Sequence, residues 1–276
     1  MPPRTHKNKL RKKKKIKLKR KKQKIQKQKQ KIQQQKLQKI QKIIKGKNMS
    51  GNKIENYEKL FTSKDDWYAK SKQFWKESEP TVNGMLGGYE EISEEDTQHS
   101  IQFLSQFLDR FSQSKTKYAL DCGSGIGRVT KNVFLPSFDA VDLVDSENSF
   151  LEVAKQNLDP KKVLNFYCSP LEKFTPDPNK YDLIWVQWVA IYFADDDFVI
   201  FLKNCKQALK ENGIIIIKDN SSKNNGFVLD ESDNSIIRSI PHYKSIFKEA
   251  NLEILKEETI LFTGASLYPV TTFALK

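Results

Sequence analysis

Three glycines occupy alternate positions in the segment Asp121-Cys-Gly-Ser-Gly-Ile-Gly-Arg128. The apolar run 118–120 precedes this segment, and Val129 and Val133 follow it at helical spacing. A glycine turn between a strand and a helix lets the backbone approach a ligand and directs the first helical N–H groups toward it. We therefore expect a site for a nucleotide-type cofactor here; a tight turn that binds no ligand is the alternative.

The charged residues of this segment favour one cofactor over others. A dinucleotide fingerprint would place its third glycine where Arg128 stands. A phosphate-binding loop would need Gly-Lys-Ser/Thr, which this segment does not contain. Asp121 would add negative charge beside a pyrophosphate, but it suits a cofactor with a cationic ammonium and sulfonium, whose carboxylate Arg128 suits. These charges match S-adenosylmethionine.

Residues that end or follow the next two predicted strands can complete such a site. The predicted strand 140–145 ends in Asp145, where an acid accepts hydrogen bonds from both ribose hydroxyls. The predicted strand 163–168 leads into Leu171 and Glu172, which are placed to cover an adenine.

Two further predicted strands end in polar or aromatic residues. The strand 181–188 is nearly all apolar, as a central parallel strand should be, and it ends in Gln187 and Trp188. The strand 214–217 is followed by the polar segment 218–220. Because open α/β sheets bind ligands at the carboxyl ends of their strands, we expect these residues at one edge.

The alternation of strands and helices after residue 118 predicts an α/β fold with a doubly wound parallel sheet. Upstream, aromatic residues at helical spacing predict a helix over 57–75, in which Trp75 fits a packed core. The glycine-rich segment 80–89, around Leu86, predicts a mobile loop or lid. The other expected elements are helices over 101–111, 198–209 and 243–250 and closing strands over 252–259 and 268–275.

Charge is divided unevenly along the 276 residues, whose net charge is +14. Residues 1–48 contain 22 Lys and Arg and no acid, and the remainder contains 26 basic and 34 acidic residues, a net charge of −8. Such a composition predicts a disordered Lys/Gln-rich tail over 1–52 and one folded domain with a full core over 53–276. The run 11–15 fits a contact with nucleic acid or an import receptor, and a merely solvated charged tail is the alternative.

The three cysteines form no disulfide framework and lack metal-ligand spacing, which fits a reducing compartment. The cysteine spacing gives us no metal site to expect, and because the sequence has no run of about 18 apolar residues, we expect no membrane span. We expect a cytoplasmic and nuclear protein.

Four segments together resemble the protein N-terminal α-amine methyltransferases, which act on Xaa-Pro-Lys/Arg termini. The resemblance covers about residues 57–276 and includes the segments 80–89, 121–128, 185–188 and 218–220. It implies a seven-stranded Rossmann-like sheet of the class I methyltransferase type with an N-terminal helical extension.

The resemblance also implies a role for individual residues. The implied S-adenosylmethionine contacts are Gly123, Arg128, Asp145, Leu171, Glu172 and Gln187. The implied substrate contacts are Trp75, Leu86, Trp188, Asp230 and Ser235, with Trp75 and Trp188 as aromatic walls and with Asp230 and Ser235 facing the basic third residue. By the same resemblance, Asn220 holds the substrate terminus and Asp233 is the general base.

The chain departs from this family at Tyr192, where a His usually serves as a second candidate base. An unperturbed tyrosine, with a pKa of about 10, is a poor base near neutral pH. This leaves Asp233 as the main candidate. From the residues alone, the acids of 230–233 also fit a solvated acidic loop.

Three functions remain open at this point. The first is methylation of Xaa-Pro-Lys/Arg protein N-termini. The second is methylation of another protein or a small molecule by an enzyme of the same fold, and the third is a non-catalytic RNA- or ribosome-binding module.

The first residues are Met1-Pro-Pro-Arg4, which would form an Xaa-Pro-Arg terminus after removal of the methionine. This match predicts self-methylation or inhibition by the tail; a coincidental match is the alternative.

Overall fold

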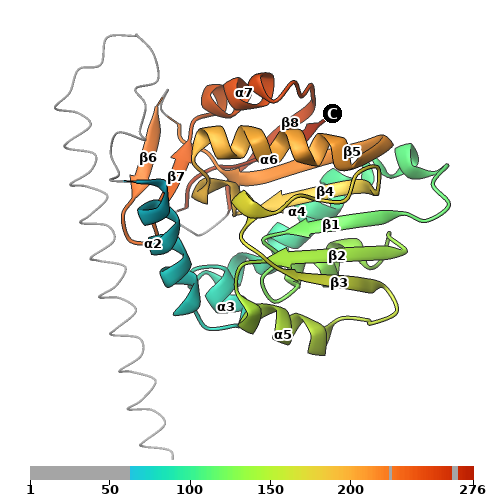
Figure 1. Cartoon of the computed structure of the whole chain (residues 1–276), viewed down its shortest axis with the longest axis horizontal. Helices are drawn as coiled ribbons and strands as arrows, with labels where there is room; N and C mark the ends of the chain where they lie inside the picture. Colours follow the sequence, from blue (N-terminus) through green and yellow to red (C-terminus); the bar gives the residue numbers. More distant parts are fainter. Residues whose placement is uncertain (1–62, 224–225, 263–266) are drawn as a thin grey trace, which may run out of the picture. The chain divides into compact units, whose positions relative to one another are not determined.

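A computed structural model of the chain describes residues 63–223, 226–262 and 267–276. Its centre is a seven-stranded sheet in the order β3-β2-β1-β4-β5-β9-β8 (Figure 1). The strands are β1 (Tyr118–Cys122), β2 (Ala140–Asp145), β3 (Val163–Cys168), β4 (Tyr181–Gln187), β5 (Leu209–Asn220), β8 (Ile254–Ile260) and β9 (Val270–Leu275). Strands β1 to β5 pair in parallel, whereas β9 runs antiparallel to β5 and β8. The predicted α/β fold with a seven-stranded Rossmann-like sheet is confirmed.

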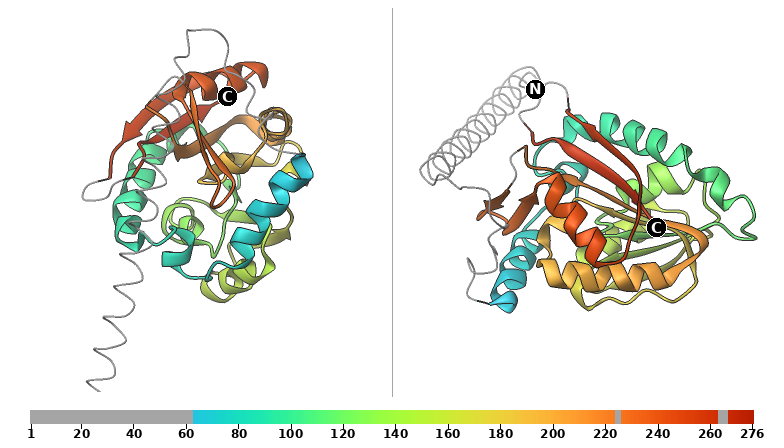
Figure 2. Two further views of the ribbon diagram at one scale, coloured as in Figure 1. Left: turned by 90° about the vertical axis from the view of Figure 1, so that its left-hand side faces the viewer. Right: turned by 90° about the horizontal axis from the view of Figure 1, so that it is seen from above.

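Helices cover both faces of this sheet. The helices are α2 (Lys64–Lys76), α3 (Val82–Met85), α4 (Ser93–Ser105), α5 (Asn148–Asn157), α6 (Asp195–Ala208) and α7 (Ile240–Glu249), with a π-helical turn η4 (Thr130–Phe134) and 3-10 turns η2 (Glu90–Ile92), η3 (Leu108–Phe111), η5 (Leu171–Lys173) and η6 (Ala190–Tyr192). Figure 2 shows α6 and α7 on one side of the sheet and α4 on the other.

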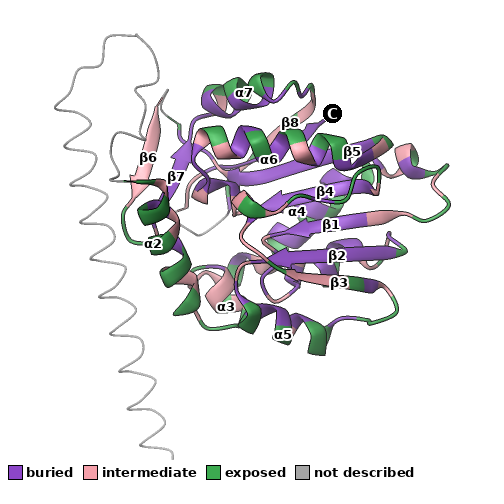
Figure 3. Ribbon diagram, in the orientation of Figure 1, coloured by how far each residue is buried: buried purple, intermediate pink, exposed green. Residues whose placement is uncertain are grey.

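Alternating side chains of the strands fill the two cores between these layers. Ile184 and Ile215 pack under α6 and α7, whereas Leu183 and Ile214 pack with α4, η4 and α5. Successive strand residues point to opposite faces, so both faces of a covered parallel sheet must be apolar. The inner strands are accordingly buried, while β3 at the edge is only partly buried (Figure 3).

The glycine-rich segment 80–89, predicted as a mobile loop or lid, has more regular structure than a loop. It contains the short helix α3, whose first N–H groups are capped when the Thr81 hydroxyl accepts a hydrogen bond from Gly84 N at 3.1 Å. Leu86 is buried in a small apolar cluster with Ile92 and Val270. Burial of Leu86 anchors this part of the segment in the domain by one apolar side chain.

Two boundaries around β5 also differ from their predictions. Helix α6 ends at Ala208, one residue before the predicted end, and β5 begins at Leu209, five residues before the predicted start of its strand at residue 214. An irregularity in the β4–β5 pairing accommodates these additional strand residues. Gly213 fits here because an added Cβ would lie 2.8 Å from the Tyr181 carbonyl oxygen.

The acidic segment after β5 forms a two-stranded hairpin, which the sequence patterns did not predict. Strand β6 (Phe227–Asp230) pairs antiparallel with β7 (Ser235–Arg238). The hairpin packs against α2, where Ile236 contacts Trp67 and the Asn234 amide donates to Trp67 O at 3.0 Å (Figure 1).

The predicted tail 1–52, and the part of the predicted helix 57–75 that precedes residue 63, lie outside the described residues. Within the described ranges, no helix combines the length and the apolar character that crossing a membrane requires.

Candidate active site

A cavity of about 350 Å³ lies at the carboxyl ends of β1, β2 and β4. It brings together residues that are far apart in the sequence. The predicted site residues that line it are Trp75, Leu86, Gly123, Arg128, Asp145, Leu171, Glu172, Gln187 and Trp188. They include every residue for which the family resemblance implied a cofactor contact. Asn220, Asp230, Asp233 and Ser235 are not among the described residues that line it.

The glycine turn forms one wall of the cavity. All three of its glycines have positive φ, a backbone conformation that other residues rarely adopt. A Cβ on Gly123 would lie 2.8 Å from the Val189 side chain, and one on Gly125 would lie 2.6 Å from the Met85 sulfur. Larger residues would therefore strain the turn and push against both neighbours.

Asp145, at the end of β2, braces this turn from below. Its Oδ2 accepts a hydrogen bond from Gly125 N at 2.8 Å, and its Oδ1 accepts one from Glu147 N at 2.9 Å. Burial raises the pKa of Asp145 to about 6, although both backbone N–H groups favour its charged form. Each carboxylate oxygen can accept a further bond, so Asp145 can also bind ligand hydroxyls.

Asp121 does not take the place that its charge suggested. It is buried beneath the turn, where its Oδ2 accepts a hydrogen bond from the Thr130 hydroxyl at 2.5 Å, and it is not among the described cavity-lining residues. Burial raises the pKa of Asp121 to about 6. It fastens β1 to the helix after the turn, and the reasoning that paired it with a cationic cofactor group placed it too near the ligand.

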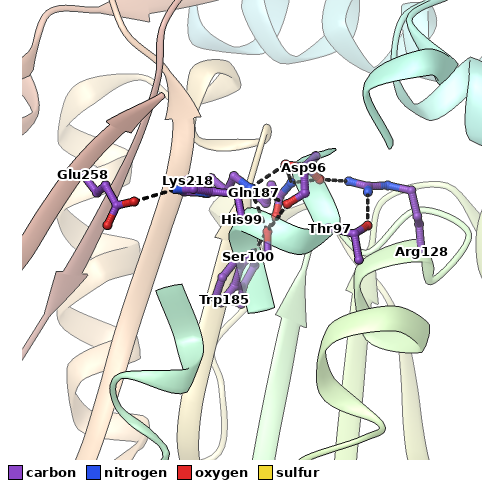
Figure 4. Close-up of polar contacts among 9 residues, drawn as sticks. All are labelled: Asp96, Thr97, His99, Ser100, Arg128, Trp185, Gln187, Lys218 and Glu258. Atoms are coloured by element: carbon purple, nitrogen blue, oxygen red, sulfur yellow. Dashed lines mark hydrogen bonds and ion pairs between the residues drawn. The ribbon is translucent and has the colours of Figure 1, made fainter. Parts of the chain in front are cut away.

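Arg128 is held by an acid that the sequence analysis did not identify. Its Nη2 donates to Asp96 Oδ2 at 2.7 Å, and its Nη1 donates to the Thr97 hydroxyl at 3.4 Å (Figure 4). Asp96 and Arg128 are both buried. A guanidinium carries five N–H donors, so the two bonds to α4 leave others for a ligand carboxylate.

Asp96 also binds two residues at the strand ends. Lys218, at the end of β5, forms an ion pair with Asp96 Oδ1 at 2.5 Å, and the Gln187 amide donates to both Asp96 oxygens. Burial opposes the charge of Asp96, but Lys218 and Arg128 outweigh it, so its pKa lies below the ordinary value. We call Asp96, Arg128, Gln187 and Lys218 the Asp96 cluster; Figure 4 shows it with its neighbours.

Gln187 is oriented entirely by this cluster and its neighbour. Its Nε2 donates to Asp96, while its Oε1 accepts a hydrogen bond from Trp185 Nε1 at 2.9 Å. The side chain lines the cavity with its amide already engaged. Direct contact between Gln187 and a cofactor therefore stays a prediction.

Sequence patterns did contain a signal for Asp96. On α4, Asp96 lies on the same helical face as the buried residues Ser100, Phe103 and Leu104, so it is an acid in an apolar stripe. The predicted helix over 101–111 begins after Asp96, whereas α4 begins at Ser93, so the prediction left Asp96 outside this stripe. A buried acid needs partners, and it finds them on distant strands.

Two tryptophans form aromatic walls of the cavity. The Trp75 ring lies edge-on to Phe150 and Tyr192, with centroids 6.3 and 5.9 Å away. Trp188 follows β4 with a positive φ of 52°, and its ring lies 5.7 Å from the Arg128 guanidinium. Such strain in a non-glycine residue is typical of functional sites. Trp75 thus lines the cavity instead of filling a closed core.

Asp233 lies behind the cavity wall in the turn of the β6–β7 hairpin. The Tyr192 hydroxyl donates to its Oδ2 at 3.1 Å, and the Ser235 hydroxyl donates to its Oδ1 at 2.7 Å. Burial raises the pKa of Asp233 to about 6. A carboxylate with this pKa can take up a proton near neutral pH.

Two other predicted site residues end strands near this region: Asp230 ends β6 of the hairpin, and Asn220 ends β5. Asp230 caps its own turn, since its Oδ1 accepts bonds from the backbone and the hydroxyl of Ser232. Asn220 is half-buried at the end of β5, two residues beyond Lys218, whose carbonyl accepts a hydrogen bond from Trp188 N at 3.0 Å. Their substrate roles stay predictions.

The cavity residues fit S-adenosylmethionine. Asp145 has a carboxylate that could accept hydrogen bonds from ribose hydroxyls, and Arg128 has a cation that could pair with the methionine carboxylate. Leu171 and Glu172 lie next to each other on η5 and line the same cavity. Burial raises the pKa of Glu172. The glycine turn gives the backbone close access to a ligand.

Comparison with known proteins identifies close relatives. Residues 63–276 match the model of a family described as AdoMet-dependent proline di-methyltransferase. The chain is 44% identical over 213 residues to N-terminal Xaa-Pro-Lys N-methyltransferase 1 of Homo sapiens, which covers 76% of this chain and 95% of that protein. It is 43% identical over 224 residues to alpha N-terminal protein methyltransferase 1 of Oryza sativa subsp. japonica, covering 77% of this chain and 72% of that one.

A solved structure has the same architecture. A SAM-dependent methyltransferase from Leishmania major superposes with a TM-score of 0.72 at 38% sequence identity, covering 78% of this chain and 85% of that chain. The resemblance inferred from the four sequence segments is thereby confirmed.

Proposed function

The chain belongs to the AdoMet-dependent proline di-methyltransferase family, and we propose that it methylates the free α-amino group of proteins that begin Xaa-Pro-Lys or Xaa-Pro-Arg. As a family member it is an enzyme, a methyltransferase that uses S-adenosylmethionine. The proposal concerns the substrate class and the residues that act on it.

One observation carries the proposal: the residues that fit the cofactor and the two tryptophan walls line the same cavity. A rigid, apolar proline ring packs well between aromatic faces, and Trp75 and Trp188 provide them. The net charge of −8 outside residues 1–48 favours a cationic peptide terminus.

Each residue has a task that follows from its chemistry. Bound S-adenosylmethionine supplies an electrophilic methyl group on its sulfonium. Arg128 would bind its methionine carboxylate and Asp145 its ribose hydroxyls, while Leu171 and Glu172 would cover its adenine. The enzyme must then bring the substrate's α-amino group to that methyl group in its uncharged form, because only a free lone pair can attack it.

Proton removal is accordingly the main chemical task of this site. An α-amino group has a pKa of about 7.7–8.0, so a fair fraction is neutral near pH 7. Asn220 would hold the substrate terminus, and Asp233 would receive its proton. Orientation of the amine accounts for the remaining acceleration.

A peptide assay tests this function. We expect transfer to an Xaa-Pro-Lys peptide with a free terminus, and none to the same peptide when its terminus is acetylated. An Xaa-Ala-Lys peptide is the matched control for the proline. Mass spectrometry that located the methyl group on a side chain, or equal rates for all three peptides, would contradict the proposal.

We propose separately that the basic residues 1–48 bind nucleic acid or an import receptor and support residence in both cytoplasm and nucleus. Their 22 Lys and Arg with no acid support this proposal. Removing these residues from a fluorescently tagged protein should abolish nuclear accumulation, and unchanged accumulation would contradict the role in import.

A further inference from the structure

Tyr192 stands between the cavity and Asp233. It lines the cavity, whereas Asp233 does not line it among the described residues. Its hydroxyl donates to Asp233 Oδ2 at 3.1 Å, so the phenol is the direct hydrogen-bonded link from the cavity wall to this carboxylate. A phenol both donates and accepts hydrogen bonds, which neither Trp75 nor a simple apolar wall could do.

We propose that Tyr192 is a catalytic proton relay, which passes the proton of the substrate's α-ammonium group to Asp233. The inference rests on the proposed function, because it places an amine in this cavity. The ammonium N–H bond breaks as its proton bonds to the Tyr192 oxygen, and the Tyr192 O–H bond breaks as that proton bonds to Asp233 Oδ2. The nitrogen keeps the electron pair, so a cation and a carboxylate become a neutral amine and a neutral acid.

A relay avoids the difficulty of tyrosine as a base. Burial, reinforced by the charge of Asp233, raises the pKa of Tyr192 well above its ordinary value, so a free tyrosinate is excluded near neutral pH. Simultaneous arrival and departure of a proton leaves the phenol neutral throughout. Asp233, with a pKa of about 6, is the final acceptor.

The charged groups around the pair favour this direction of transfer. Asp230, in the same hairpin, raises the pKa of Asp233, and Asp219, on β5, raises that of Tyr192. The hydroxyl of Ser235 works the other way and keeps the Asp233 pKa from rising further. A group surrounded by acids gains from accepting a proton.

The fold fixes the distance between the two residues. Trp67, on α2, donates from Nε1 to Tyr192 O at 2.6 Å, while its own carbonyl accepts from the Asn234 amide at 3.0 Å. Asn234 adjoins Asp233 in the hairpin turn. One tryptophan therefore ties η6 to the hairpin and holds the relay together.

The experiment compares Tyr192→Phe, Tyr192→His and Asp233→Asn in the full-length chain, using the Xaa-Pro-Lys peptide. We expect Tyr192→Phe to lower kcat by about 100-fold or more, the range for a lost proton-transfer group, with small changes in KM and cofactor affinity. Tyr192→His should restore turnover, because an imidazole can also transfer a proton. The Tyr192→Phe/Asp233→Asn double variant should be no slower than the slower single variant, since the two residues act as one unit.

Tyr118→Phe is the matched control. Tyr118 donates to Asp142 Oδ1 at 2.7 Å, is not among the described cavity-lining residues, and should keep normal turnover when its hydroxyl is removed. Near-normal turnover of Tyr192→Phe at pH 6–9, or multiplying losses in the double variant, would overturn the relay. A wild-type protein that did not methylate the peptide would instead overturn the proposed function.

Discussion

Two carboxylates near the carboxyl ends of the strands, the buried Asp96 and the half-buried Asp233, have opposite protonation tendencies. Asp96 faces Lys218 and Arg128, and their charges hold its pKa below the ordinary value despite burial. Asp233 faces the hydroxyls of Tyr192 and Ser235 instead, and burial raises its pKa to about 6. Burial is common to both, so the difference comes from the neighbours.

This difference in pKa suits Asp96 to a structural role and Asp233 to the proposed proton transfer. A carboxylate between two cations stays ionised and can orient them, and here Asp96 orients Arg128 and Gln187 toward the cavity. A carboxylate bonded to neutral hydroxyls can gain a proton near neutral pH. The substitutions below exchange or remove these properties, in order of decreasing expected effect.

Asp233→Asn should cause the largest loss. It keeps the shape of the residue and removes its proton acceptor, so we expect turnover to fall about 100- to 10,000-fold. Steady-state kinetics measures this loss, and calorimetry should show nearly unchanged cofactor affinity. Near-normal turnover at pH 6–9 would show that Asp233 is not the base.

The pH profile of the wild type is a second test of Asp233. Because its pKa is about 6, turnover should fall as the pH drops below 6, and Asp233→Asn should lose this dependence.

The same raised pKa makes the ionised form of Asp233 destabilise the fold, so its contribution to the free energy of unfolding decreases as the pH rises from about 4 to 6. The contribution of Asp96 has the opposite sign and is lost as the pH falls below about 4, which urea unfolding at several pH values can resolve.

Asp96→Asn should mainly reduce stability. It leaves Lys218 and Arg128 buried without their carboxylate, and breaking a buried ion pair from one side costs about 3–5 kcal/mol. Urea unfolding measures the change. Glu94→Gln is the matched control, an exposed acid on the same helix that should change stability by less than about 0.5 kcal/mol. Equal effects of the two variants would show that Asp96 has no special role.

Asp145→Ala should act on cofactor binding. Hydrogen bonds to a charged acceptor contribute about 1.5–3 kcal/mol, which corresponds to roughly a 10- to 150-fold weaker affinity for S-adenosylmethionine. Isothermal calorimetry measures it. Unchanged affinity would remove Asp145 from the cofactor site and leave it a structural role through its hydrogen bonds from Gly125 N and Glu147 N.

The sequence predicted what parallel strands impose. Residues at the carboxyl ends of neighbouring strands must meet, so Gly123, Asp145 and Gln187 could be placed together from strand patterns alone. The β6–β7 hairpin could not be predicted from the sequence, because short strands with acids in their turn resemble a solvated loop. Asp96 was missed because the predicted helix over 101–111 began too late to include it, and its partners Lys218 and Arg128 are distant in sequence.

Thr97→Val is the smallest change and tests how far the Asp96 cluster depends on its edge. The Thr97 hydroxyl accepts from Arg128 Nη1 at 3.4 Å, a long hydrogen bond beside the 2.7 Å contact between Arg128 and Asp96. Valine keeps the shape and removes only this acceptor, so stability should fall by about 0.5 kcal/mol, the low end for a hydrogen bond. Cofactor affinity should hardly change, because Asp96 still holds the guanidinium. A loss in calorimetry as large as that of Asp145→Ala would mean that Thr97, and not Asp96, positions Arg128.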